Sequence, residues 1–302
     1  MDKKKAEQAM EIAPKHIAVF LLEVDHLLAR MHPEVDPFFV QRTFHDTVML
    51  FRGESPGYRA SSTKYHDLPH TLAVFLATAR LTHGAICAGQ PLSRRGVELV
   101  LAAALLHDAG FIQTVDDDTG TGAKYTIGHE ERSITFMAHY LAENNRVPRD
   151  ILDCAQLIAC TVISDSPAEI AFTDPENELL GQILGTADLL AQMADRAYLE
   201  KLFLLYRELD EAGISGFDSE LRLLEKTQEF YEKLVKHRLS NELGDAARFM
   251  RVHYRVRWDQ DFDPYELSIR NNLDYLKHVL QECRHSYRSR FRRGGIVAEL
   301  EG

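Results

Sequence analysis

The stretch LVLAAALLHDAGF, residues 99–111, contains the longest apolar run of the chain and ends that run on a histidine–aspartate pair. Its apolar residues show no alternation of period two, so they favour a buried helix over a half-exposed strand. Ser93 is a suitable N-cap for this helix, and Gly110 follows it as a typical C-terminal glycine. Because the backbone at a helix end turns neighbouring side chains toward one space, His107 and Asp108 can both face the same ligand.

Helical spacing of apolar residues continues on both sides of this stretch. Upstream, YHDLPHTLAV (residues 65–74) begins a helix in which Asp67 is a suitable N-cap and Pro69 fits the first turn. The predicted helices cover approximately residues 37–52, 68–88, 93–107, 129–144, 148–162, 177–212, 219–239 and 263–283. The sequence therefore predicts an all-α protein built as a helical bundle.

Gly213 and Gly216 interrupt the helical pattern and mark a soft boundary. We predict N-terminal helices packed on the core in residues 1–60, a core that carries the motifs in residues 61–212, and a helical extension in residues 213–302. The amphipathic helices of the extension either complete the core or form a homodimer face. The sequence leaves both open.

The composition limits the classes of function. A net charge of -11 over 302 residues argues against general nucleic-acid binding, which needs a basic face. The four cysteines form no CxxC pair, which is typical of reduced thiols and predicts a cytoplasmic protein. The longest apolar run is far shorter than the roughly 20 residues of a membrane span, so we predict no membrane segment.

Separate segments of the chain carry histidines and aspartates that can bind a metal ion together. They are His66 with His70, His107 with Asp108, His129 at a predicted helix start, and Asp188. Imidazole and carboxylate are the ligands expected for a borderline divalent ion such as Mn, Fe, Co, Ni or Zn. Two buried aspartates would be costly as bare charges, and a cation removes that cost.

The order of these motifs resembles the HD superfamily of metal-dependent phosphohydrolases. YHDLPHT, LLHDAG, GHEERS and TADLL follow one another in the order of that superfamily over residues 65–190. YHDLPHT is also similar to the YHNxxHA stretch of cyclic-nucleotide phosphodiesterases, a branch of the same superfamily. The resemblance implies an HD-type helical bundle with a metal centre at its core.

The resemblance also implies a role for each matching residue. The implied metal ligands are His70, His107, Asp108 and Asp188, with Asp108 also counted among the catalytic residues. His66 is implied to protonate the leaving oxygen, and the alternative is a histidine that caps or packs at the helix entrance. His129 is either a ligand of a second metal or a substrate contact, because Cys160 and Thr161 stand where other two-metal members have a further histidine.

Two cations near the motifs are candidates for binding substrate. Lys124 in the long polar loop 112–128 and Arg132 after GHEE can meet a phosphate. The alternative is that both are solvated surface cations. For the remaining histidines we expect surface or core positions.

Together these features predict a metal-dependent phosphohydrolase. Its substrate would be a small phosphorylated metabolite, a nucleotide or cyclic nucleotide, cleaved at a phosphodiester or phosphomonoester bond by a hydroxide held on the metal. The cofactor would be one or two ions of Mn, Fe, Co, Ni, Zn or Mg. The rival interpretations are a nucleotide-sensing or signalling module without turnover, and a di-iron oxygenase, which would need the further histidine.

Overall fold

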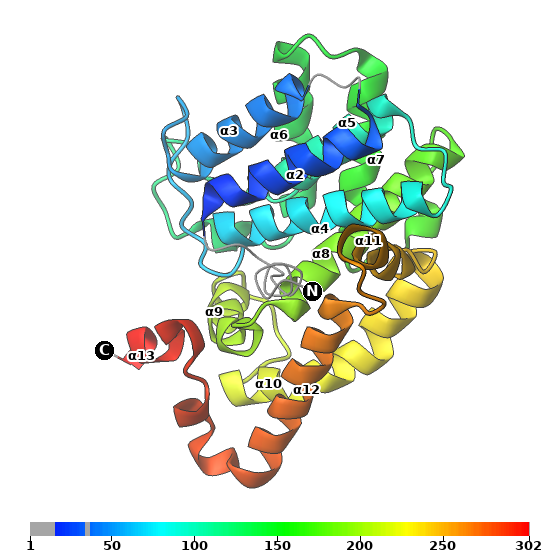
Figure 1. The fold of residues 1–302 in the computed structure, drawn as a ribbon. Coiled ribbons are helices and arrows are strands. Elements are labelled where there is room, and N and C mark those ends of the chain that lie inside the picture. Colours follow the sequence, from blue (N-terminus) through cyan, green and yellow to red (C-terminus); the bar gives the residue numbers. More distant parts are fainter. Residues whose placement is uncertain (1–15, 34–36, 302) are drawn as a thin grey trace.

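A computed structural model describes residues 16–33 and 37–301, and these residues form a bundle of helices (Figure 1). The α-helices are α2 (Ile17–Met31), α3 (Phe38–Phe51), α4 (Leu68–Cys87), α5 (Arg94–Leu106), α6 (His129–Glu143), α7 (Pro148–Ala159), α8 (Pro175–Ala194), α9 (Tyr198–Glu211), α10 (Glu220–Phe230), α11 (Arg248–Trp258), α12 (Pro264–Glu282) and α13 (Ile296–Glu301). Within the described ranges no β-strand forms, and two isolated bridges, Arg52 with Ala60 and Tyr58 with Thr114, tie loops together. The predicted all-α class is confirmed.

None of the described helices combines the length and the apolar character needed to cross a membrane.

Helix α4 is the centre of the bundle. It packs against α2, α5, α8 and α11, and Figure 1 shows it crossing the middle of the molecule. The predicted N-cap is confirmed, because the Asp67 carboxylate accepts a hydrogen bond from the backbone N–H of His70. At the other end, a Cβ on Gly84 would lie 1.9 Å from the carbonyl oxygen of Phe249, so only glycine lets α11 cross here.

Helix α5 carries the apolar run that ends at the histidine–aspartate pair. Its predicted cap is confirmed, because the Ser93 hydroxyl accepts a hydrogen bond from the N–H of Gly96. Gly110 is not the left-handed C-terminal glycine that we expected, since its φ is not positive and it lies in a 3-10 turn. A Cβ on Gly110 would lie 2.0 Å from the carbonyl oxygen of His129, so this glycine permits the close approach of α6.

The long helix predicted from residue 177 is two helices, α8 and α9. The chain turns at Asp195, whose carboxylate accepts a hydrogen bond from the N–H of Ala197. Asn272 of α12 donates its amide to the carbonyl oxygens of Met193 and Asp195 and so fixes this turn. The turn directs α9 back toward the start of α4, where its acidic side chain contributes to the site below.

The helices beyond residue 213 pack on the same core as the helices before it. Helix α11 packs on α4 and α12 packs on α8, and the apolar side chains of all four belong to one cluster. The division near residue 213 stays a prediction. The first 15 residues of the predicted N-terminal segment lie outside the described residues.

Candidate metal centre

Histidines and aspartates from α4, α5 and α8 meet at one buried point. His70 stands in the first turn of α4, His107 and Asp108 directly follow α5, and Asp188 lies inside α8. His70 Nε2 is 3.4 Å from Asp108 Oδ2 and 3.3 Å from Asp188 Oδ1. His107 Nε2 is 3.4 Å from the same oxygen of Asp108 and 3.9 Å from that of Asp188.

Two buried atoms at this point lack hydrogen bonds, so both are free to bind an ion. His107 Nε2 and Asp108 Oδ2 have no hydrogen-bond partner among the described residues. The other ring nitrogen of His107, Nδ1, donates to the carbonyl oxygen of Ala104, so Nε2 presents its lone pair to the centre. Leaving such atoms unsatisfied costs about 1–3 kcal/mol each. The buried group of His70, His107 and Asp108 could hold a metal ion.

Burial and the neighbouring imidazoles shift the pKa values of the two aspartates of the centre in opposite directions. Burial alone would raise the pKa of Asp108, but His107, His66 and His70 lower it below its usual value. Burial likewise opposes ionisation of Asp188, yet its hydrogen bond with His70 and the nearby His107 lower its pKa. Buried carboxylates surrounded by imidazoles are the donor set that a borderline divalent ion prefers.

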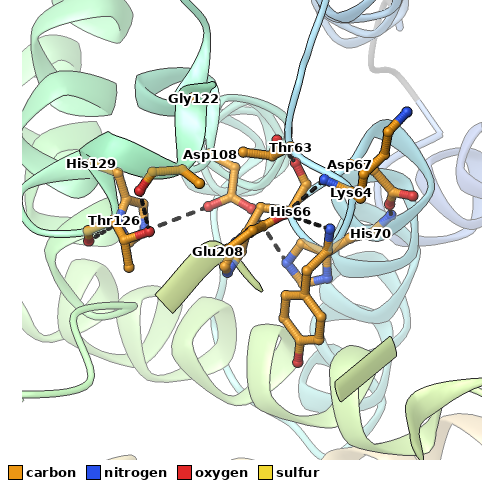
Figure 2. Close-up of polar contacts among 12 residues, drawn as sticks. Thr63, Lys64, His66, Asp67, His70, Asp108, Gly122, Thr126, His129 and Glu208 are labelled. Atoms are coloured by element: carbon orange, nitrogen blue, oxygen red, sulfur yellow. Dashed lines mark hydrogen bonds and ion pairs between the residues drawn. The ribbon is translucent and has the colours of Figure 1, made fainter. Parts of the chain in front are cut away.

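His129, at the first position of α6, faces the second oxygen of Asp108. Its Nε2 lies 3.7 Å from Asp108 Oδ1, while Nδ1 donates to the carbonyl oxygen of Thr126. Glu130 Oε2 is also 3.2 Å from that Nδ1. In Figure 2, Asp108 stands between His129 and the pair formed by His66 and His70. Asp108 therefore offers one oxygen to each side of the centre.

His66 lies beside the centre and is held by a carboxylate from α9. Its Nδ1 donates to Glu208 Oε2 over 2.8 Å, and the backbone N–H groups of Lys64 and Tyr65 both donate to Glu208 Oε1 over 2.7 Å (Figure 2). Burial alone would lower the pKa of His66, but this hydrogen bond and the charge of Asp108 raise it above its usual value. Glu208 therefore fixes the position of the His66 imidazole in the turn before α4, and the pKa of this imidazole is raised.

Phe111 packs against both His66 and His129, whose ring centroids are 6.0 Å apart. Its ring stacks on His66 with centroids 4.4 Å apart and on His129 with centroids 4.2 Å apart. Phe111 is the third residue after the histidine–aspartate pair, so the turn that follows α5 supplies a ring that packs on both imidazoles.

The sequence did not identify Glu208, Phe111 or Gln192 as parts of the site. Gln192 connects Tyr65 with Asp188. Its side-chain amide accepts a hydrogen bond from the Tyr65 hydroxyl and donates one to Asp188 Oδ1, each over 3.0 Å. The one signal for Glu208 was its place beside apolar positions of an amphipathic helix, where a carboxylate is unexpected. No local signal marks the partner of a residue 142 positions away.

The cations predicted to bind substrate have partners of their own. Lys124 is paired with Asp117 of the long loop. Arg132 Nε donates to the carbonyl oxygen of Gly110, and its guanidinium lies 3.5 Å from the centre of the Tyr125 ring. Lys124 links residues within the loop, and Arg132 joins α6 to the turn after α5. Their role toward a substrate stays a prediction.

Cys160 stands at the end of α7, where the further histidine of other two-metal proteins was sought. It is buried against α8, since a Cβ on Gly181 would lie 2.6 Å from its sulfur. Burial raises the pKa of this thiol to about 12. Among the described residues, Cys160 is not part of the group whose donor atoms could share an ion. Its neighbour Thr161 lines the cavity instead.

A cavity of about 780 Å³ opens from the centre, which is within the usual range for small-molecule sites. His66, His70, His107 and His129 line it together with both aspartates. The centre is therefore accessible to a substrate from one side, while α4, α5 and α8 enclose the other.

The protein family described as Npun_R2479-like matches residues 57–252. This segment contains every residue of the site from His66 to Glu208. No curated protein and no solved structure matches the chain.

Proposed function

The chain belongs to the Npun_R2479-like family, and we propose that it is a metal-dependent phosphohydrolase of the HD type acting on a small phosphorylated substrate. The observation that carries the proposal is the pair of buried atoms without hydrogen bonds, His107 Nε2 and Asp108 Oδ2, at the floor of a cavity lined by further imidazoles. Nucleotides and cyclic nucleotides are the first substrates to test.

The residues around this pair have the chemistry of a first coordination sphere. His70, His107, Asp108 and Asp188 would hold the ion, and His129 faces the second oxygen of Asp108 for a second ion or a substrate. A bound divalent cation would lower the pKa of a water molecule and supply positive charge that stabilises the phosphoryl oxygens. The ion would be Mn, Fe, Co, Ni, Zn or Mg.

His66 would donate the proton that the leaving oxygen needs. Its Nδ1 is engaged by Glu208, so Nε2 is the nitrogen that can carry a transferable proton into the cavity. The hydrogen bond with Glu208 contributes to the raised pKa of His66 and so helps this imidazole to hold a proton. Proton donation of this kind contributes about 10²–10⁴-fold to a rate.

The proposal is tested by a substrate panel and by elemental analysis of one purified sample. The protein is loaded with Mn or Ni and offered nucleotides, cyclic nucleotides, other phosphodiesters and phosphomonoesters. We expect bound metal and hydrolysis that a chelator abolishes. Metal and nucleotide binding without turnover of any ester would instead indicate a sensing module, and oxygen consumption by an iron-loaded sample would indicate an oxygenase.

The proposal includes a cytoplasmic location and a homodimer formed through the C-terminal helices. Cys87, Cys154, Cys160 and Cys283 are all free thiols, which is consistent with a reducing compartment. The dimer is tested by light scattering on the purified chain, where a single-chain mass would contradict it.

A further inference from the structure

The cavity beside the candidate metal centre lacks the cations that a highly charged phosphate needs. Besides the aspartates of the centre, its lining contains Glu130, Glu131 and Asp165. Among the described residues that line it, none is a lysine or an arginine. A polyphosphate would bring several negative charges into this space, in a chain whose net charge is already -11.

Basic side chains near the lining are engaged elsewhere, as Lys201 is with Asp195. Arg238 donates to the carbonyl oxygens of Val162 and Asp165 and thereby holds one segment of the cavity in place. Lys233, in the neighbouring groove, is paired with Glu229. Like Lys124 and Arg132 above, these cations have partners on the protein and are not part of the lining.

The neutral polar groups of the lining are also engaged. Gln192 uses both ends of its amide, on the Tyr65 hydroxyl and on Asp188. The hydroxyls of Thr126 and Thr161 donate to carbonyl oxygens within their own turns. The edge of a nucleobase, which is recognised through donors and acceptors, would have to share these groups with the protein contacts that they already make.

Apolar side chains make up much of the remaining lining. They are Leu189, Leu205, Leu209, Ile214, Phe230, Val162, Ile163 and Ile127. Ile127, Ile163 and Phe230 are 75%, 40% and 39% exposed, so the apolar lining continues to the mouth of the cavity. Exposed apolar side chains that meet at a binding site favour an apolar ligand group.

We propose that the substrate is a phosphodiester with a single negative charge and an apolar substituent, in preference to a nucleotide with further phosphates. This inference rests on the proposed function and narrows its substrate. The metal centre takes the one charged phosphoryl group, and the apolar lining takes the substituent. In the reaction the oxygen of water bonds to phosphorus, the ester P–O bond breaks, and the leaving oxygen receives a proton.

Binding is tested with probes that cannot be cleaved. Dialkylphosphinates carry one negative charge and no ester bond, and their chains can be lengthened one methylene at a time. Calorimetry on the Mn-loaded protein should give a dissociation constant that falls about three- to fourfold per added methylene until the cavity is filled. A constant independent of chain length would overturn the inference.

Matched variants show whether the apolar lining is responsible. Phe230→Ser and Ile127→Ser, both at side chains more than a third exposed, should fold normally and flatten the dependence on chain length. Leu152→Ser removes an apolar side chain outside the cavity whose exposure, 51%, lies between those of Phe230 and Ile127, and it should leave the dependence unchanged. If the dissociation constant fell equally with chain length in all three variants, the cavity would not be the site of the apolar substituent.

Turnover separates failure of this inference from failure of the proposed function. Hexyl 4-nitrophenyl phosphate should be hydrolysed with a kcat/KM at least about tenfold above the methyl diester, and above 4-nitrophenyl phosphate, ATP and cyclic AMP. Faster cleavage of the nucleotides would overturn the inference and leave a phosphohydrolase. Chain-length-dependent binding without cleavage of any ester would keep the ligand class and overturn the proposed function.

Discussion

Helix α4 buries a histidine near each end, and the two histidines have opposite surroundings. At the start of the helix, His70 faces the carboxylates of Asp108 and Asp188. Near the other end, His83 Nδ1 lies 3.2 Å from His253 Nδ1. Burial, together with the charges of nearby arginines, lowers the pKa of His83 to about 4 and that of His253 well below its usual value.

The comparison shows that buried histidines alone do not make a metal centre. In the part of the chain that the structure describes, His70, His107 and Asp108 form the one group whose donor atoms are close enough to share an ion. The His83–His253 pair is also buried, but the charged groups near it are arginines, whereas those near His70 are carboxylates. The carboxylates therefore distinguish a group that could hold an ion from a pair of core histidines.

The largest expected effect is the loss of metal and activity together when the first site is changed. His107→Ala removes a ligand and leaves the Asp108 charge uncompensated, so bound metal and hydrolysis should both fall to background. The control is His83→Gln at the other end of α4, which should keep the metal. Elemental analysis and an ester assay measure both. A metal-loaded His107→Ala protein would contradict the assignment.

The next largest effect concerns His66, which lies beside the first site but is not expected to bind the ion. His66→Ala should retain the metal and lose about 10²–10⁴-fold in kcat on esters with a poor leaving group. The loss should be much smaller on 4-nitrophenyl esters, whose leaving oxygen needs no proton. An equal loss on both kinds of ester would exclude the role of proton donor.

Replacing Glu208 tests the support of His66 by an element far away in sequence. Glu208→Gln keeps an oxygen for the backbone N–H groups but weakens the hold on the imidazole, so kcat should fall about 10–100-fold while KM changes little. As for His66, the loss should be greater for poor leaving groups. Should KM rise with kcat unaffected, Glu208 would serve substrate binding and not the orientation of His66.

The smallest expected effect is a loss of protein stability at low pH that comes from His83. His83 is neutral in the folded protein but takes up a proton near pH 6.5 when unfolded, so stability present above about pH 6.5 is lost as the pH falls toward about 4. His83→Gln removes this term. Between about pH 7.5 and pH 5, the Tm of the wild type should fall roughly 3–5 °C further than that of the variant. Parallel curves would show that His83 does not contribute.

Much of the fold and the grouping of two histidines with one aspartate could be predicted because their signals are local. Apolar periodicity identified the helices, and the caps Asp67 and Ser93 stand where expected. Ordered motifs identified His70, His107 and Asp108, which the structure brings together. These features depend on neighbours in sequence or on a shared motif order.

What could not be predicted depends on contacts between distant segments. Glu208 reaches His66 only because the chain turns at Asp195 and returns α9 to the start of α4. Gly110 was assigned to a helix end, whereas its lack of a side chain serves the approach of α6. The charge of the cavity likewise depends on side chains from many separate segments. Only the folded chain shows that its described lining contains no lysine or arginine.

Anomalous diffraction from crystals soaked in Mn²⁺ tests the central claim most directly. We predict a strong peak among His70 Nε2, His107 Nε2, Asp108 Oδ2 and Asp188 Oδ1, and none between His83 and His253. A well-ordered site without a peak among those four atoms, or a peak at the second histidine pair alone, would contradict the account.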